Sequence, residues 1–149
     1  MQTAVRAGRN RILFATIAAL SLAGVVDSAI ALQRHYAKSA TQFCDFRQQL
    51  NCDIVNRSEY STIQGIPVAA IGILGYAALF LLSTLWKSRP ETPTRLLVVS
   101  LGGFAFALYL TYIEAHELMT WCILCLVSQA LIFLICALAV FIKLRSPQP

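Results

Sequence analysis

The feature that most limits the fold of this chain is a stretch of 21 residues without a charged side chain, residues 66–86. A helix that crosses a bilayer needs about 20 consecutive and mostly apolar residues. Gly65 and Pro67 mark a turn at its start, and proline suits the first turn of a helix. The stretch therefore predicts a membrane-spanning helix over residues 66–86.

Three further apolar stretches, residues 12–32, 96–113 and 118–142, predict three more membrane helices. One charge, Asp27, interrupts the first, and Ala29-Ile30-Ala31 resembles the cleavage site of a secretory signal peptide. The apolar core of a signal peptide has only about 7–15 residues, so we interpret the first stretch as a spanning helix.

The composition agrees with a membrane protein, since 58% of the residues are apolar and 13% are charged, against roughly 25% charged residues in soluble domains. We expect one membrane domain over residues 1–149, an all-α integral membrane protein folded as a four-transmembrane-helix bundle. The net charge of +5 is therefore not interpreted as a nucleic-acid footprint, and we expect no nucleic-acid partner. In a membrane protein the distribution of the basic residues matters more, because it fixes the topology.

Basic residues indicate which side of the membrane each connection faces, because cytoplasmic loops carry an excess of Lys and Arg. The amino-terminal segment, the second connection and the carboxyl-terminal segment are basic, through Arg6, Arg9, Arg11, Lys87, Arg89, Arg95, Lys143 and Arg145. We expect these three segments in the cytoplasm, and the loop 33–64 and the acidic connection 114–117 on the outer side. Both cysteine pairs then face the outer side, which is oxidising in a bacterium.

The outer loop, residues 33–64, is polar and carries the first cysteine pair, Cys44 and Cys52. Within it, residues 54–63 can form a short amphipathic helix that lies on the membrane. Its apolar side would consist of Ile54, Val55, Tyr60 and Ile63.

The second pair, Cys122 and Cys125, forms a C-x-x-C motif at the start of the fourth apolar stretch. Two thiols three residues apart on a helix lie on nearly one face, close enough to form a disulfide, and the N–H dipoles at a helix start favour a thiolate on the first. A haem-attachment motif is excluded, because it needs a histidine after the second cysteine and Leu126 stands there. A four-thiolate zinc site stays a formal alternative, although such sites usually join two short C-x₂₋₄-C pairs, and here seven residues separate the first pair. The motif therefore favours redox chemistry.

Several motifs occur in a characteristic order: the C-x₇-C pair in the first loop, then Ser58, then Gly65-Ile66-Pro67, and finally the C-x-x-C motif after Trp121. In this order and topology the chain resembles the vitamin K epoxide reductase family in its bacterial form, over about residues 12–142. The resemblance implies a four-helix bundle around a quinone.

The resemblance also implies a role for each cysteine. Cys125 is the cysteine that attacks the quinone, Cys52 exchanges with Cys122, and Cys44 is the outer thiol that a partner reaches. The resemblance therefore makes the loop pair the shuttle between a soluble partner and the membrane.

By the same resemblance, the cofactor is a quinone of the ubiquinone, menaquinone or vitamin K type, and the partner is a thioredoxin-like periplasmic protein. Many members carry that thioredoxin domain fused after a fifth span. This chain ends at Pro149 without either, so we expect a separate thioredoxin-like partner and a place in the bacterial inner membrane. Vertebrate-like members have a tyrosine where this chain has Gln129, which argues against vitamin K epoxide as the natural substrate.

Two polar residues inside the spans are candidate quinone contacts. Gln129, four residues after Cys125, can donate a hydrogen bond to a quinone oxygen or to a neighbouring helix. Asp27 can help to deliver the protons that quinone reduction consumes, or it can make a structural hydrogen bond, and an acid inside a membrane helix is by default a functional-site hypothesis.

Four further residues have open interpretations. Ser58 and Ser61 are candidate quinone contacts, with capping or loop roles as the alternative. Cys136, about 16 Å deeper than the C-x-x-C motif at 1.5 Å per residue, is interpreted as a small buried hydrophobe. Glu114, which precedes the motif, can tune the thiols or be solvated.

The sequence thus predicts a membrane thiol–disulfide oxidoreductase that oxidises a thioredoxin-like protein, passes the electrons to a quinone and so supports disulfide formation. A first alternative is reduction of a quinone or of vitamin K epoxide as the main role. A second, of a different class, is a non-enzymatic membrane subunit with structural disulfides. Structural disulfides resist mild reductants, whereas a relay pair exchanges readily.

Overall fold

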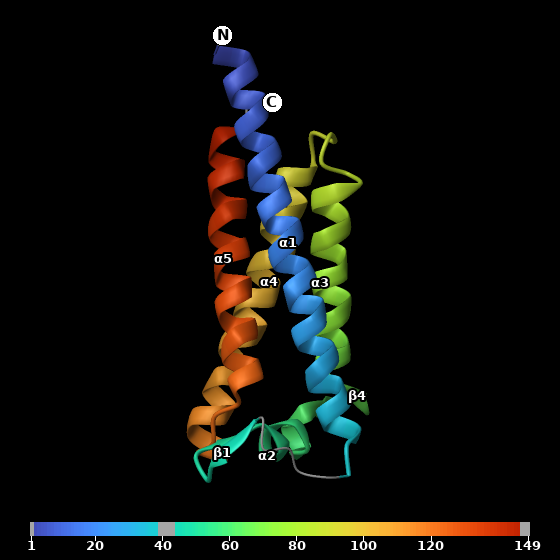
Figure 1. Cartoon of the computed structure of the whole chain (residues 1–149), viewed down its shortest axis with the longest axis vertical. Coiled ribbons are helices and arrows are strands. Elements are labelled where there is room, and N and C mark those ends of the chain that lie inside the picture. Colours follow the sequence, from blue (N-terminus) through green and yellow to red (C-terminus); the bar gives the residue numbers. More distant parts are fainter. Residues whose placement is uncertain (1, 39–43, 147–149) are drawn as a thin grey trace.

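Four long helices pack side by side in the computed structural model, which describes residues 2–38 and 44–146 (Figure 1). They are α1 (Gln2–Tyr36), α3 (Val68–Thr84), α4 (Thr92–Ile113) and α5 (Ile123–Arg145). Each helix contributes a fully buried side chain to the centre of the bundle: Ile17, Leu79, Leu96 and Ile135. The predicted all-α membrane fold is confirmed in its helical character.

Three segments are long and apolar enough to cross a membrane: Gly8–Tyr36, Thr92–Leu118 and Ile123–Arg145. The fourth apolar helix, α3, has 17 residues and is shorter than the predicted 66–86. Its start is displaced because residues 62–67 form a hairpin of β3 (Thr62–Ile63) and β4 (Ile66–Pro67).

The turn of this hairpin uses two residues with positive φ, Gln64 at 51° and Gly65 at 82°. Glycine adopts such a conformation without a steric penalty. The turn motif in the sequence is therefore real, but it belongs to a hairpin that precedes the helix.

The outer loop contains β1 (Asp45–Arg47), β2 (Leu50–Asn51), α2 (Cys52–Asn56) and a 3₁₀ turn, η1 (Glu59–Ser61). The predicted amphipathic helix over residues 54–63 is therefore wrong in its extent, since the α-helix begins earlier and ends at Asn56. Asn51 caps its start by accepting a hydrogen bond from the Ile54 N–H at 3.0 Å. The Ser61 hydroxyl donates to the Ser58 carbonyl at 2.6 Å, so local hydrogen bonds replace a continuous helix.

A second correction concerns the predicted acidic connection 114–117. These residues form a π-helical turn, η2 (Glu114–Leu118), that directly continues α4. Met119, with φ of 48°, ends this turn, and α5 begins only at Ile123 instead of at residue 118. The C-x-x-C motif therefore straddles the start of a helix.

The two ends of the bundle differ in content. Figure 1 shows both chain ends and the α3–α4 connection at one end of the bundle, and β1, α2 and β4 at the opposite end. The loop cysteines and the start of α5 consequently lie together, away from the basic segments.

Gly24 of α1 allows one close helix contact, because a Cβ atom there would lie 2.3 Å from the ring of Tyr76 on α3. The Tyr76 hydroxyl also donates to the Ser128 carbonyl at 2.8 Å, which restrains the ring. We expect Gly24→Ala to lower the free energy of unfolding by about 1–3 kcal/mol, the usual cost of overpacking. Thermal unfolding in detergent measures this effect.

The matched control is Gly8→Ala on the same helix, where an added Cβ meets nothing within 4 Å. Alanine is the better helix former by about 1 kcal/mol, so this variant should be at least as stable as the parent. Equal melting temperatures for the two variants would show that the contact with Tyr76 does not constrain the bundle.

Candidate functional site

The loop cysteines are joined. Cys44 and Cys52 form a disulfide with a Cα–Cα distance of 5.6 Å. Only 1% of Cys44 and 0% of Cys52 is exposed, and both pack in a cluster with Ala31, Val55 and Cys122. The expectation of a disulfide that a soluble protein can touch directly is therefore not met in this conformation.

The C-x-x-C cysteines are free thiols. Cys122 is the residue before α5 and has extended backbone, with φ of −107° and ψ of 122°, whereas Cys125 lies in the first helical turn. A hydrogen bond from the Cys125 thiol, together with N–H groups of the first turn, lowers the pKa of Cys122, although burial and Glu114 oppose the shift. This direction agrees with the expected thiolate preference of the first cysteine.

Backbone pairing holds the two cysteine pairs together. The Asn51 N–H donates to the Trp121 carbonyl at 3.1 Å, and the Trp121 N–H donates to the Gln49 carbonyl at 2.9 Å. These bonds make a parallel bridge between β2 and the residue before the motif. Cys52 follows Asn51 in the chain and Cys122 follows Trp121, so the pairing places the two sulfurs in the same buried cluster.

Asn56 connects the same two cysteines through its side-chain amide. Its Nδ2 donates to the Cys52 carbonyl at 2.9 Å and to the Cys122 sulfur at 3.7 Å, and the residue is buried. His35 of α1 fixes the residue from the other side, because its Nδ1 lies 2.5 Å from the Asn56 carbonyl, which can only accept a hydrogen bond. The amide therefore stabilises negative charge on Cys122.

Sequence reasoning missed Asn56. The only available signal was its position four residues after Cys52, which places it on the same helix face in α2. Nothing in the sequence shows that this face meets Cys122.

We expect Asn56→Ala to slow thiol–disulfide exchange between Cys52 and Cys122 by about tenfold, since a hydrogen bond to a charged group contributes about 1.5–3 kcal/mol. The rate is measurable by quenching with an alkylating agent and mass spectrometry of the linked peptides. Asn51→Ala is the matched control, because it removes the cap of the same helix without touching Cys122. Equal rates in both variants would assign the effect to helix stability alone.

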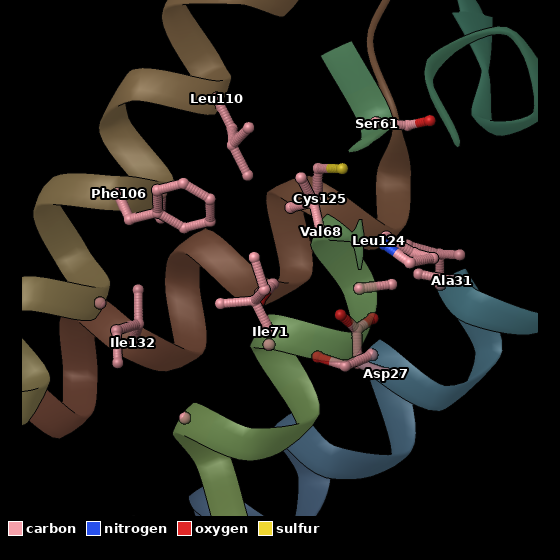
Figure 2. Close-up of a pocket in the computed structure, with 18 of the residues that line it drawn as sticks. Asp27, Ala31, Ser61, Val68, Ile71, Phe106, Leu110, Leu124, Cys125 and Ile132 are labelled. Carbon is pink, nitrogen blue, oxygen red and sulfur yellow. The ribbon is translucent and has the colours of Figure 1, made fainter. Parts of the chain in front are cut away.

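Cys125 lines a cavity of about 340 Å³ between the four long helices, shown in Figure 2. Apolar walls come from α3, α4 and α5, including Ile71, Phe106, Leu110 and Ile132. Ligand pockets in proteins typically have about 300–1,000 Å³ and a few polar groups among apolar walls. The volume and the apolar lining fit the ring of a membrane quinone.

The predicted quinone contacts fall into two groups. Asp27, Ser58 and Ser61 line the cavity with Cys125, although the Ser58 hydroxyl donates to the Val55 carbonyl at 2.8 Å as a capping group would. Gln129 lies outside the lining and accepts a hydrogen bond from Thr111 of α4 at 3.4 Å, which is the helix–helix alternative. The role of each as a quinone contact stays a prediction.

Two other residues have clear positions. Cys136 is a free and buried thiol further along α5. Glu114 is 2% exposed and lines the cavity, so it is not a solvated residue of a loop.

Comparison with known proteins agrees with this geometry. No curated protein matches the chain significantly. The model of the vitamin K epoxide reductase family matches residues 15–140, which include all four helices of the bundle for most of their length and both cysteine pairs. The chain therefore belongs to the vitamin K epoxide reductase family.

Proposed function

We propose that this family member is a membrane thiol–disulfide oxidoreductase that oxidises a separate thioredoxin-like protein and passes the electrons to a quinone. One observation carries the proposal: Cys52 is held beside Cys122, while Cys125 lines an apolar cavity between the helices. The two pairs thus connect the outer loop to a space that a lipid-soluble acceptor can enter.

The transfer begins at the loop pair. A partner thiolate bonds to Cys44, which breaks the Cys44–Cys52 bond and frees Cys52. The second partner thiol then attacks the partner sulfur of this mixed disulfide, so that Cys44 is released as a thiol and the partner leaves with its own disulfide. Cys52 attacks Cys122 in the oxidised C-x-x-C pair, which forms a Cys52–Cys122 bond and releases Cys125. Cys44 restores the loop disulfide by attacking Cys52, which frees Cys122.

The last step returns the C-x-x-C pair to a disulfide. Cys122 and Cys125 together lose two electrons and two protons, which pass to the quinone in the cavity. The described state, with the loop pair joined and the C-x-x-C pair reduced, is the one that precedes this step.

Ubiquinone or menaquinone is the proposed acceptor, and Asp27, Ser58 and Ser61 are proposed contacts because they line the cavity. Reduction of vitamin K epoxide is the first alternative. A non-enzymatic role with structural disulfides is the second, and the free C-x-x-C thiols beside the disulfide speak against it.

The test is anaerobic. The purified chain is reduced, freed of reductant, mixed with ubiquinone or menaquinone analogues, and its thiols are counted. We expect two thiols lost for each quinone reduced, and renewed turnover when a reduced thioredoxin-like protein is added. A constant thiol count with every quinone would refute the proposed function.

The proposed location is the bacterial inner membrane, with four spans and both chain ends in the cytoplasm. The basic segments and the cysteine site lie at opposite ends of the bundle, which supports this orientation (Figure 1). We expect a reporter fused after Pro149 to be active only in the cytoplasm. Activity of the same fusion on the outer side would reverse the orientation, and a reporter inserted in the loop provides the opposite control.

A further inference from the structure

Glu114 is the most deeply buried acid among the described residues and has no role in the electron path above. It is 2% exposed and begins the π-helical turn η2 at the end of α4. Its Oε2 accepts the backbone N–H of Cys122 at 3.1 Å, and its own carbonyl accepts the Thr120 N–H at 3.2 Å. The first hydrogen bond holds the carboxylate against the C-x-x-C motif, and the second fixes the backbone of the same residue.

The second carboxylate oxygen, Oε1, is buried and has no hydrogen-bond partner within residues 2–38 and 44–146. An unpaired buried oxygen of this kind is costly, so it calls for an explanation. The carboxylate interacts with the thiol of Cys125, and both residues line the same cavity. The Cys125 S–H is therefore the titratable donor in this cavity that can turn toward the unpaired oxygen.

The charges in this site restrict where the thiol proton can go. If Cys125 released its proton to water, a thiolate would stand beside a carboxylate in a buried site, and two like charges there repel strongly. If the proton moves to Glu114, one negative charge shifts from oxygen to sulfur and no charge is added. Proton transfer within the pair is thus the route that creates the thiolate without a second buried charge.

We infer that Glu114 is the proton acceptor for Cys125 and the proton donor to the reduced quinone, an inference that rests on the proposed function. The Cys125 S–H bond breaks and an O–H bond forms on Glu114, while the sulfur electron pair becomes available to the quinone. As Cys122 and Cys125 join, two electrons leave the pair. One proton reaches the hydroquinone from Glu114, which becomes a carboxylate again, and the other comes from the Cys122 thiol.

Other titratable groups line the cavity, and the test must separate them from Glu114. They are Asp27 and His35 of α1, Tyr60 of η1 and Tyr76 of α3. The groups that interact with the Glu114 carboxylate are Cys122 and Cys125. A change in pH dependence that follows substitution of Glu114 alone is therefore assigned to Glu114 and Cys125.

The decisive variant is Glu114→Gln, whose amide oxygen can still accept the Cys122 N–H but cannot take a proton. We expect single-turnover oxidation of the C-x-x-C thiols by a soluble ubiquinone analogue to slow at least tenfold. General acid–base catalysis typically contributes about 10²–10⁴-fold, and residual proton transfer to water makes the observed loss smaller. The remaining rate should rise with pH, since hydroxide must then remove the proton. Glu114→Asp should restore part of the rate at neutral pH.

Glu117→Gln is the matched control, because Glu117 lies in the same turn but is exposed. It should keep the parental rate and pH profile. A Glu114→Gln chain with the parental rate, or with a slow rate that keeps the parental pH profile, would overturn the inference and leave Glu114 a structural residue.

A second measurement needs no quinone. Alkylation of Cys125 by iodoacetamide, followed by mass spectrometry across a range of pH, reports its thiolate in the reduced chain. We expect Glu114→Gln to move this profile to lower pH, because a negative neighbour is removed, and Glu117→Gln to leave it in place. An unmoved profile in Glu114→Gln contradicts the inference. Failure of the parent chain to reduce any quinone contradicts the proposed function instead, so the two failures are distinguishable.

Discussion

Replacing Cys125 with alanine is expected to abolish quinone reduction and to leave the chain with a disulfide between Cys52 and Cys122. In this variant the Cys122 thiolate still lies in the same buried cluster as the loop disulfide. Its attack on Cys52 releases Cys44 as a thiol, so the exchange needs no oxidant. Cys44 can reverse this exchange, so the Cys52–Cys122 bond accumulates once an alkylating agent blocks the released Cys44 thiol.

The linked peptides are identified by mass spectrometry after alkylation under non-reducing conditions. Cys136→Ala is the control, because this thiol is buried in α5 and free, and it should leave turnover near normal. Loss of turnover is also expected for Cys44→Ala, Cys52→Ala and Cys122→Ala. If Cys125→Ala instead captures a partner protein directly on Cys122, the loop pair is not the shuttle and the proposed order is wrong.

Filling the cavity is expected to separate the two halves of the reaction. Gly75 of α3 lines the cavity, and a Cβ atom there would meet nothing within 4 Å. A phenylalanine at this position should fill part of the cavity that Cys125 lines. We expect it to slow quinone reduction about a hundredfold, the loss expected when reacting groups are displaced by about 1 Å. Exchange between the partner and the loop disulfide should continue, since no loop residue changes.

Leu74→Phe serves as the matched control, because the preceding side chain is 71% exposed and points away from the bundle. Stopped-flow quinone reduction and partner oxidation are measured separately on both variants. Parental quinone reduction by Gly75→Phe would mean that the electron acceptor does not use this cavity.

The sequence was sufficient for the features that depend on composition along the chain. Apolar stretches predicted helices because a membrane helix must satisfy its own backbone hydrogen bonds. The distribution of Arg and Lys grouped the cysteine pairs at one end of the bundle, and the structure has them at one end. Cysteine spacing identified the loop pair, which the structure joins in a disulfide, whereas the C-x-x-C cysteines are free thiols.

Features that depend on contacts between distant segments could not be predicted. The position of Cys122 before α5 follows from the π-helical turn and from the left-handed backbone of Met119, which no local propensity indicates. Asn56 meets Cys122 only because β2 pairs beside Trp121. From the sequence alone, Glu114 has the character of a loop residue. It lies against the C-x-x-C motif because of the π-helical turn η2.

Burial of the loop disulfide has a consequence for selectivity among reductants. Small soluble thiols are abundant in many compartments. In the proposed reaction, an open disulfide would let them pass electrons to the quinone without oxidising a protein partner. With only 1% of Cys44 exposed, the loop must first be displaced, and a small thiol has little binding energy with which to displace it. A protein that docks on the loop can supply that energy through its interface. Molecular recognition, in place of reduction potential, would then decide which thiols are oxidised.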